Sequence, residues 1–177
     1  MTTRHVEIEQ RVAEQMARNL TLTVQSIAAL GNAAAALRVL PGPATARAVI
    51  QTEHAWREME EEFGLLDASQ LGRLAGSRAK VARSWASQKH RDRQILGVRR
   101  RNRFVYPGFQ LDSLGAIKPA IPAVLATFDH ARWTEEHGAL WFVSANGWLG
   151  GRRPVDVLDS DADGVIQASL RATAEQW

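Results

Sequence analysis

The chain has 177 residues, 45% of them hydrophobic and 23% charged, which suits one globular domain or two small ones and excludes a long disordered chain. It contains no cysteine, so disulfides, thiolate metal sites and a cysteine nucleophile are excluded. Its formal net charge is only +3, from 22 Lys and Arg against 19 Asp and Glu. No apolar run is long enough to span a bilayer and no signal-like start is visible. We therefore expect a cytoplasmic protein without a membrane partner.

Residues 1–64 are predicted to form a helical hairpin. Apolar residues step by threes and fours through residues 5–40, Pro41-Gly42-Pro43 stops that helix, and a second helix runs over residues 44–63. This pair has more apolar surface than it can bury alone. It either packs on the rest of the chain or forms a homodimer. We favour dimerisation, because two-fold operators suit dimeric DNA-binding proteins. The apolar side of the second helix is Ile50, Trp56, Met59 and Phe63.

Residues 65–112 carry the pattern of a helix-turn-helix with a wing. Asp67 and Gln70 have the spacing of a reciprocal N-cap, and Gly76 is the residue type that ends the short helix behind them. Ser77 can cap a second helix, on which Val81, Ala82 and Trp85 share one side. The opposite side of that helix is predicted to enter a major groove.

The wing is predicted from two short strands, Ile95–Val98 and Phe104–Tyr106, joined by a tip over Arg99–Arg103. Asn102 supplies a residue that tolerates a left-handed turn position. Side chains on the helix and wing could bind phosphates or base edges. The candidate DNA-binding residues are Ser77, Arg78, Lys80, Arg83, Ser84, Ser87, Arg99, Arg100, Arg101 and Arg103.

Charge favours DNA binding by this module over a merely solvated surface. Eleven cations and two anions lie between Asp67 and Arg103, a net +9, so the rest of the chain carries −6. Crowded like charges repel each other unless a polyanion is bound. Release of counterions from DNA would exploit such a local excess.

Residues 113–177 are predicted to form a small helical bundle. Helices are expected over Ile117–His130, Leu140–Val143, Val155–Leu158 and Val165–Glu175. The acidic turn from Asp159 to Gly164 begins like a calcium loop, but its twelfth position is Leu170 instead of a bidentate Glu. A turn with Asp163 as the cap of the last helix is therefore expected. The fold class is mainly α overall, with one small β-wing.

The C-terminal part contains a series of short motifs: Trp141, Asn146, Leu149-Gly150, Arg153-Pro154, Val157-Leu158 and the helix from Val165. In this order they resemble the toxin-binding domain of the Xre–MbcA–ParS antitoxin family. Tyr106–Gln110 is also similar to the Tyr-Pro-Ala-[Trp/Phe]-Gln segment that precedes this domain in many members. The resemblance covers roughly Leu65–Trp177 and leaves the first 63 residues outside. Gly151 and the acidic turn depart from the family pattern.

The resemblance implies a type II antitoxin whose partner is a RES-domain toxin, an enzyme that degrades NAD. Ala172–Trp177 would cover the toxin's active-site cleft, with Arg171, Glu175 and Trp177 as toxin-binding residues. Trp177 could instead pack on its own core. The protein would also repress its own operon by binding operator DNA. Two alternatives stay open: a stand-alone DNA-binding regulator without a toxin, and a neutraliser that no longer binds DNA.

Motifs for catalysis are absent from the sequence. His130, Glu135, Glu136 and His137 match neither common zinc-protease spacing, and His54 stands without a second ligand at a useful distance. Nucleophile-elbow, phosphate-loop and dinucleotide motifs are missing as well. We therefore expect neither an enzyme nor a bound cofactor or metal.

Overall fold

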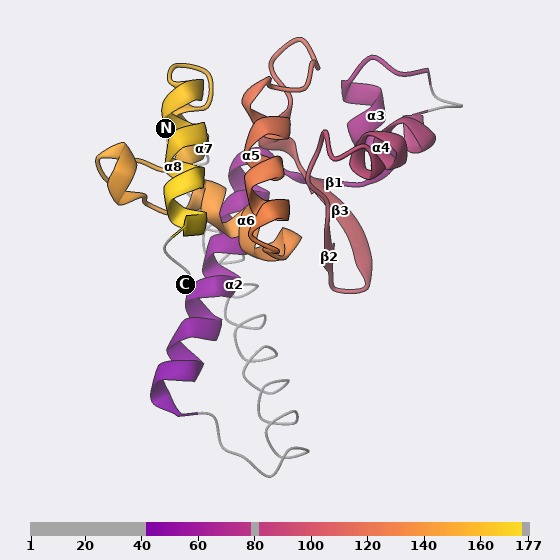
Figure 1. Ribbon diagram of the computed structural model, residues 1–177. Helices are drawn as coiled ribbons and strands as arrows, with labels where there is room; N and C mark the ends of the chain where they lie inside the picture. Colours follow the sequence, from indigo (N-terminus) through magenta and orange to yellow (C-terminus); the bar gives the residue numbers. More distant parts are fainter. Residues whose placement is uncertain (1–41, 79–81, 175–177) are drawn as a thin grey trace, which may run out of the picture. The chain divides into compact units, whose positions relative to one another are not determined.

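The computed structural model describes residues 42–78 and 82–174 (Figure 1). The chain divides into two compact units, Met1–Val49 and Ile50–Trp177. The helix predicted for residues 5–40 lies outside the described residues. The same is true of Lys80, Glu175 and Trp177 among the candidate site residues.

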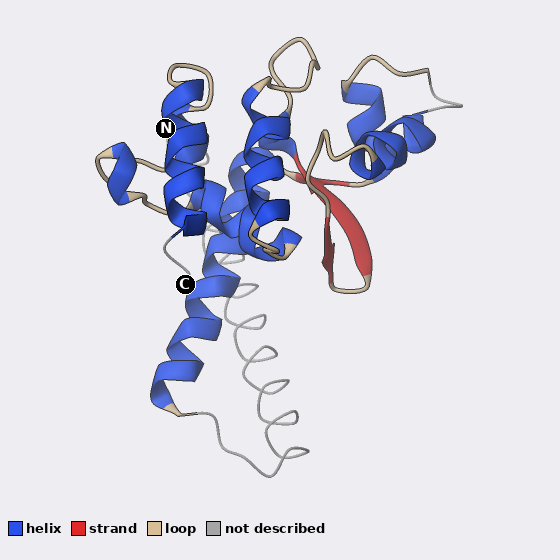
Figure 2. Ribbon diagram, viewed as in Figure 1, coloured by secondary structure: helices blue, strands red, loops and turns tan. Residues whose placement is uncertain are grey.

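The fold is mainly helical with one small antiparallel sheet, as predicted (Figure 2). In residues 42–78 and 82–174, no helix has both the length and the apolar character needed to cross a membrane. The elements are α2 (Pro43–Phe63), β1 (Leu65–Leu66), α3 (Ala68–Leu74), α4 (Ala82–Arg91), β2 (Val98–Arg100), β3 (Arg103–Pro107), η1 (Gly108–Gln110), α5 (Ala120–His130), α6 (Glu135–Val143), η2 (Gly147–Leu149), α7 (Pro154–Val157) and α8 (Ala162–Ala174).

The sheet has the order β1-β3-β2 and corrects the predicted wing. Arg100 pairs with Arg103, so only Arg101 and Asn102 form the turn, and both have positive φ, 44° and 63°. Two consecutive left-handed residues are typical of the turns that join tightly twisted hairpins. Because the turn is this short, Arg99 and Arg100 belong to a strand and not to a flexible tip. Strand β1 was missed, since two residues carry no periodic signal.

Two apolar clusters lie on opposite faces of the hairpin. Val98 and Val105 contribute to the main core, which also contains Trp56 of α2 and residues of α5, α6, α7 and α8. Tyr106, the neighbour of Val105, belongs to a smaller cluster formed with α3 and α4. Successive strand residues point to opposite faces, which explains this division. The predicted modules 65–112 and 113–177 therefore share one core within the second unit.

The C-terminal bundle begins its helices where capping residues allow. Helix α5 starts at Ala120, directly after Pro119, and α6 starts at Glu135, earlier than predicted, because the Thr134 hydroxyl accepts a hydrogen bond from the His137 N–H. Helix α8 starts at Ala162. Its cap is Asp161, whose Oδ1 lies 3.0 Å from the Gly164 nitrogen, and the prediction of Asp163 as the cap is wrong.

Helices α3 and α4 form the helix-turn-helix pair and approach each other closely at Gly72. The predicted cap of α3 is confirmed: Asp67 Oδ1 accepts from the Ser69 and Gln70 N–H groups at 2.8 Å, and Gln70 accepts from the Asp67 N–H at 2.8 Å. A Cβ on Gly72 would lie 2.1 Å from the carbonyl oxygen of Ala82. The close packing of the pair therefore requires glycine at this position.

We expect Gly72→Ala to lower the free energy of unfolding by about 3 kcal/mol, because the added methyl group forces α3 away from α4. Gly147→Ala is the matched control, since nothing lies within 4 Å of its added Cβ. That variant should stay within about 0.5 kcal/mol of the parent. Urea unfolding followed by circular dichroism measures both; equal stability of the two variants would contradict the close packing.

Candidate nucleic-acid interface

Helix α4 buries one side and exposes the side that was predicted to enter a major groove. Ala82 and Ala86 are fully buried against the rest of the module. Arg83 and Ser84 are exposed, as is Arg78 just before the helix, while Ser77 is half-buried. Ala82, Arg83 and Ser84 therefore lie as predicted, whereas Trp85 of the predicted buried side and Ser87 of the predicted exposed side are both half-buried.

The wing presents different side chains on its two faces. Arg99 and Phe104 are cross-strand partners, and both are exposed. They share the face of Tyr106, which lies towards α4. Arg100 lies on the other face with Val98, towards α2. Arg103 is the cross-strand partner of Arg100, but it lies at the end of the hairpin, where it is exposed and borders both the side towards α2 and the side towards α4. Arg101, in the turn, is exposed as well.

Arg100 does not have the role that the sequence predicted for it. Its side chain is only 17% exposed, and it donates to both carboxylate oxygens of Glu53 at 2.9 and 3.0 Å. Its guanidinium also lies 4.7 Å from the ring centroid of Trp56. Glu136 lies 3.7 Å from the same group. Arg100 therefore attaches the wing to α2 and α6, and its assignment to DNA contact is wrong.

Three of the predicted residues line one groove between α4, the wing and the start of α3. Arg83 and Ser87 come from α4, and Arg103 comes from β3. Phe104, which sequence reasoning missed, lines the same groove and is 43% exposed. Successive residues of a strand point to opposite faces, so a buried Val105 would have predicted that Phe104 faces the groove. The remaining lining residues are Asp67, Ala68, Ser69 and Tyr106.

Ser87 and Tyr106 supply polar groups to this groove. Ser87 Oγ donates to the Arg83 carbonyl oxygen at 3.1 Å. Tyr106 is buried, and its hydroxyl is hydrogen-bonded to Ser87. Burial is the larger effect and raises the pKa of Tyr106 above its ordinary value, whereas the bond to Ser87 lowers it. The tyrosine therefore stays neutral and offers no negative charge that would repel a phosphate.

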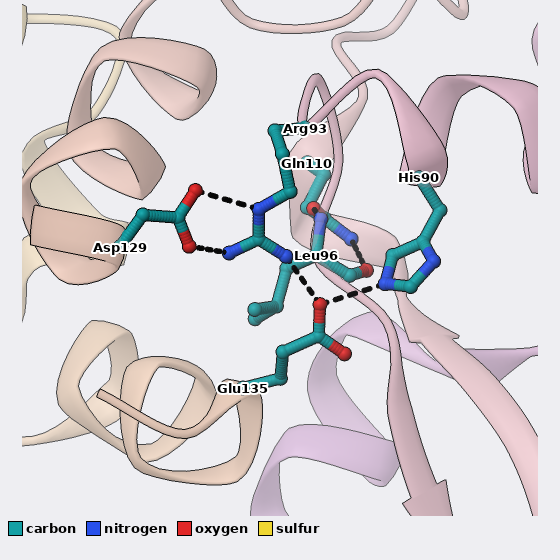
Figure 3. Close-up of polar contacts among 6 residues, drawn as sticks. All are labelled: His90, Arg93, Leu96, Gln110, Asp129 and Glu135. Carbon is teal, nitrogen blue, oxygen red and sulfur yellow. Dashed lines mark hydrogen bonds and ion pairs between the residues drawn. The ribbon is translucent and has the colours of Figure 1, made fainter. Parts of the chain in front are cut away.

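A second polar cluster joins the end of α4 to the C-terminal bundle (Figure 3). Arg93 donates through Nε to Asp129 of α5 at 2.8 Å and forms ion pairs with Asp129 and Glu135. His90 Nε2 lies 2.7 Å from the same Glu135 oxygen. The hydrogen bond that Arg93 donates to Asp129 is the largest influence on Arg93 and raises its pKa. Arg93 has φ 55°, a conformation usually left to glycine or asparagine, so the ion pairs offset a backbone cost.

A buried amide holds the base of the wing (Figure 3). The Gln110 side chain is fully buried, accepts a hydrogen bond from the Leu96 N–H and donates to the Leu96 carbonyl oxygen at 2.9 Å. It also donates to the Pro107 carbonyl oxygen at 3.0 Å. The two ends of the hairpin are thereby joined by one side chain. The glutamine of the Tyr-Pro-Gly-Phe-Gln segment is structural.

Of the three predicted toxin-binding residues, the structure describes Arg171. It is exposed on α8, and its guanidinium lies 4.6 Å from the ring centroid of Trp148. Trp148 is 52% exposed, and Leu170 next to Arg171 is 45% exposed. Sequence reasoning assigned no contact to Trp148, whose place in a glycine-rich turn was a usable signal.

Metal binding finds no support within residues 42–78 and 82–174, where no three His, Asp or Glu side chains form a group that could hold an ion. Glu135 instead contacts His90 and Arg93. In the acidic turn, Asp159 accepts from Lys118 Nζ at 2.7 Å.

Comparison with known proteins shows the fold alone. No family model matches the chain, and no curated protein matches it. Among solved structures, the NMR structure of Rv2175c is similar, with a TM-score of 0.54 and 19% sequence identity. The similarity covers 63% of this chain and 82% of that one.

The neighbouring arginines Arg99 and Arg100 should differ in their effect on stability. Arg100→Gln removes the ion pair with Glu53 and the contact with Trp56, and should lower the free energy of unfolding by about 1–3 kcal/mol. Arg99→Gln changes an exposed side chain and should stay within about 0.5 kcal/mol of the parent. Thermal and urea unfolding measure the difference. Equal losses would show that the register of the hairpin is wrong.

Proposed function

We propose that this chain binds duplex DNA, with α4 in a major groove and the wing on the neighbouring backbone. The observation that carries the proposal is the sorting of the arginines. Arg83 and Arg103 line one groove, with Arg99 exposed on the wing face that looks towards α4. Arg93 and Arg100, which lie elsewhere, are paired with carboxylates from other helices.

Arginines that are paired within the protein and arginines that are exposed should contribute differently to DNA affinity. A paired arginine already has a counterion within the protein and gains little from a phosphate. An exposed arginine displaces counterions from DNA and contributes to the salt dependence of binding. Arg83 can also donate two hydrogen bonds to a guanine edge. The proposed contacts are Ser77, Arg78, Arg83, Ser84, Ser87, Arg99 and Arg103, together with Lys80, which lies outside the described residues. Arg101 is exposed, but its guanidinium lies 3.9 Å from Glu53, so Arg101 is a weaker candidate than the sequence predicted.

DNA affinity should fall steeply with salt, and selected arginines should account for the slope. The double variant Arg99→Gln with Arg103→Gln should reduce the slope of log K against log salt by about 1.8, because two phosphate contacts are lost. Arg100→Gln is the matched control and should keep the parental slope. Fluorescence anisotropy with a short duplex measures all three. If Arg100→Gln lowers the slope as much as the double variant does, the division between paired and exposed arginines is wrong.

Arg83→Ala should act on sequence preference more than on backbone binding. We expect discrimination between the operator and a base-substituted operator to fall by about 1–3 kcal/mol, because a base-edge contact is lost. Competition anisotropy with the two duplexes measures this difference. Undiminished discrimination would place α4 outside the major groove.

We further propose that the protein is an antitoxin that neutralises a RES-domain toxin and represses its own operon as a homodimer. Two features support this proposal: the C-terminal resemblance to the Xre–MbcA–ParS family, and the exposed Trp148–Arg171 pair near the end of the chain. Aromatic and arginine side chains dominate the energetics of protein interfaces. The alternative is a DNA-binding regulator without a toxin.

Removing residues 175–177 should abolish protection of cells that express the toxin, while DNA binding and the melting temperature are retained. Arg171→Ala should weaken the complex by about tenfold or more, as expected for an interface arginine. Co-expression growth assays and co-purification measure these effects. Full protection by the truncated chain would contradict our account of neutralisation. DNA binding without protection by the full chain would favour the stand-alone regulator.

A further inference from the structure

The groove between α4 and the wing contains an exposed aromatic side chain that charge alone does not explain. Phe104 is 43% exposed and lines the groove beside Arg83 and Arg103. Its cross-strand partner is Arg99. An isolated exposed apolar residue needs no explanation, but this one lies among the cations that we assign to DNA.

The ring of Phe104 is held in place on one side and free on the other. It packs edge-on against Tyr106, with centroids 5.3 Å apart at 70°, and against His90, at 5.1 Å and 66°. Gly97 makes room for it, because a Cβ there would lie 2.5 Å from a Phe104 ring carbon. A ring that is already fixed loses little conformational entropy when a ligand covers its exposed side.

The charges of the groove define the ligand further. Arg83 and Arg103 supply two guanidiniums, which bind phosphate oxygens well. Asp67 is a carboxylate in the same lining, although its Oδ1 already accepts two N–H groups of α3. A ligand that fits would place its negative charge towards the arginines and an apolar edge on Phe104.

We propose that this groove seats one sugar-phosphate unit of a DNA strand. Arg103 contacts the phosphate, and the phenyl ring of Phe104 packs on the C–H edge of the deoxyribose, while Arg83 reaches the adjacent base edge. The unit combines an anion with an apolar edge, which is the combination that the groove offers. This inference rests on the proposed DNA binding and adds to it a contact that carries no charge.

The experiment separates the apolar contact from the ionic ones by their salt dependence. Anisotropy is measured with a labelled random-sequence duplex between about 50 and 200 mM salt, because a backbone contact needs no specific sequence. Phe104→Ala should weaken binding by roughly three- to tenfold at every salt concentration and leave the slope unchanged. Arg103→Gln should instead lower the slope by about 0.9.

Asp67→Asn tests the same groove without touching its aromatic wall. Asparagine caps a helix as well as aspartate does, so α3 should remain folded. Loss of the negative charge should tighten DNA binding by roughly two- to fivefold at low salt, and by less as salt screens the repulsion. If melting curves show that Phe104→Ala disturbs the module, Asp67→Asn becomes the deciding variant.

The outcomes distinguish the inference from the function on which it rests. A parent chain that binds no duplex at any salt concentration overturns the proposed function itself. A parent that binds with a steep salt slope, while folded Phe104→Ala and Asp67→Asn bind with parental affinity, overturns only the sugar-phosphate seat. A slope that changes with Phe104→Ala also overturns it, since an uncharged contact cannot release counterions.

Discussion

The register of the hairpin formed by β2 and β3 is the constraint on which the rest of the second unit depends. A two-residue turn at Arg101 and Asn102 places Arg100 opposite Arg103 and determines every other pair. One face then carries Val98 and Val105 into the main core, while Tyr106 enters the cluster beneath α4. A shift by one residue would exchange these faces and bury the residues that now face the groove.

The buried amide of Gln110 maintains that register at the base of the hairpin. It satisfies the Leu96 backbone and the Pro107 carbonyl, groups that would otherwise be unpaired in an apolar region. Ion pairs also attach the wing and the end of α4 to neighbouring helices. Arg100 joins the wing to α2 and α6, and Arg93 joins the end of α4 to α5 and α6. The proposed DNA-binding surface and the C-terminal bundle are thereby parts of one packed unit.

This arrangement explains why net charge along the chain is a poor guide to the exposure of individual arginines. The excess of cations between Asp67 and Arg103 is real, but the carboxylates that neutralise some of them come from outside the segment, in α2, α5 and α6. Counting charges along the chain therefore overestimates the free positive surface. Two of the exposed cations, Arg83 and Arg103, line a groove that also contains Phe104.

Local chemistry made much of the fold predictable. The capping box at Asp67, the buried and exposed sides of α4, the span of α2 and the left-handed Asn102 all follow from interactions within a few residues. Local rules failed where two nearby aspartates could each cap the same helix. Asp161 caps α8 instead of Asp163 because the helix starts at Ala162, which sequence rules did not determine.

The sequence alone determined a mainly helical chain with a basic helix-turn-helix and wing, because capping, periodicity and turn chemistry operate over short distances. Only the tertiary structure decided that Arg99 is exposed while Arg100 is paired, and that Phe104 joins Arg83 in one groove. The physical reason is that these outcomes depend on strand register and on partners such as Glu53, 47 positions from Arg100 along the chain.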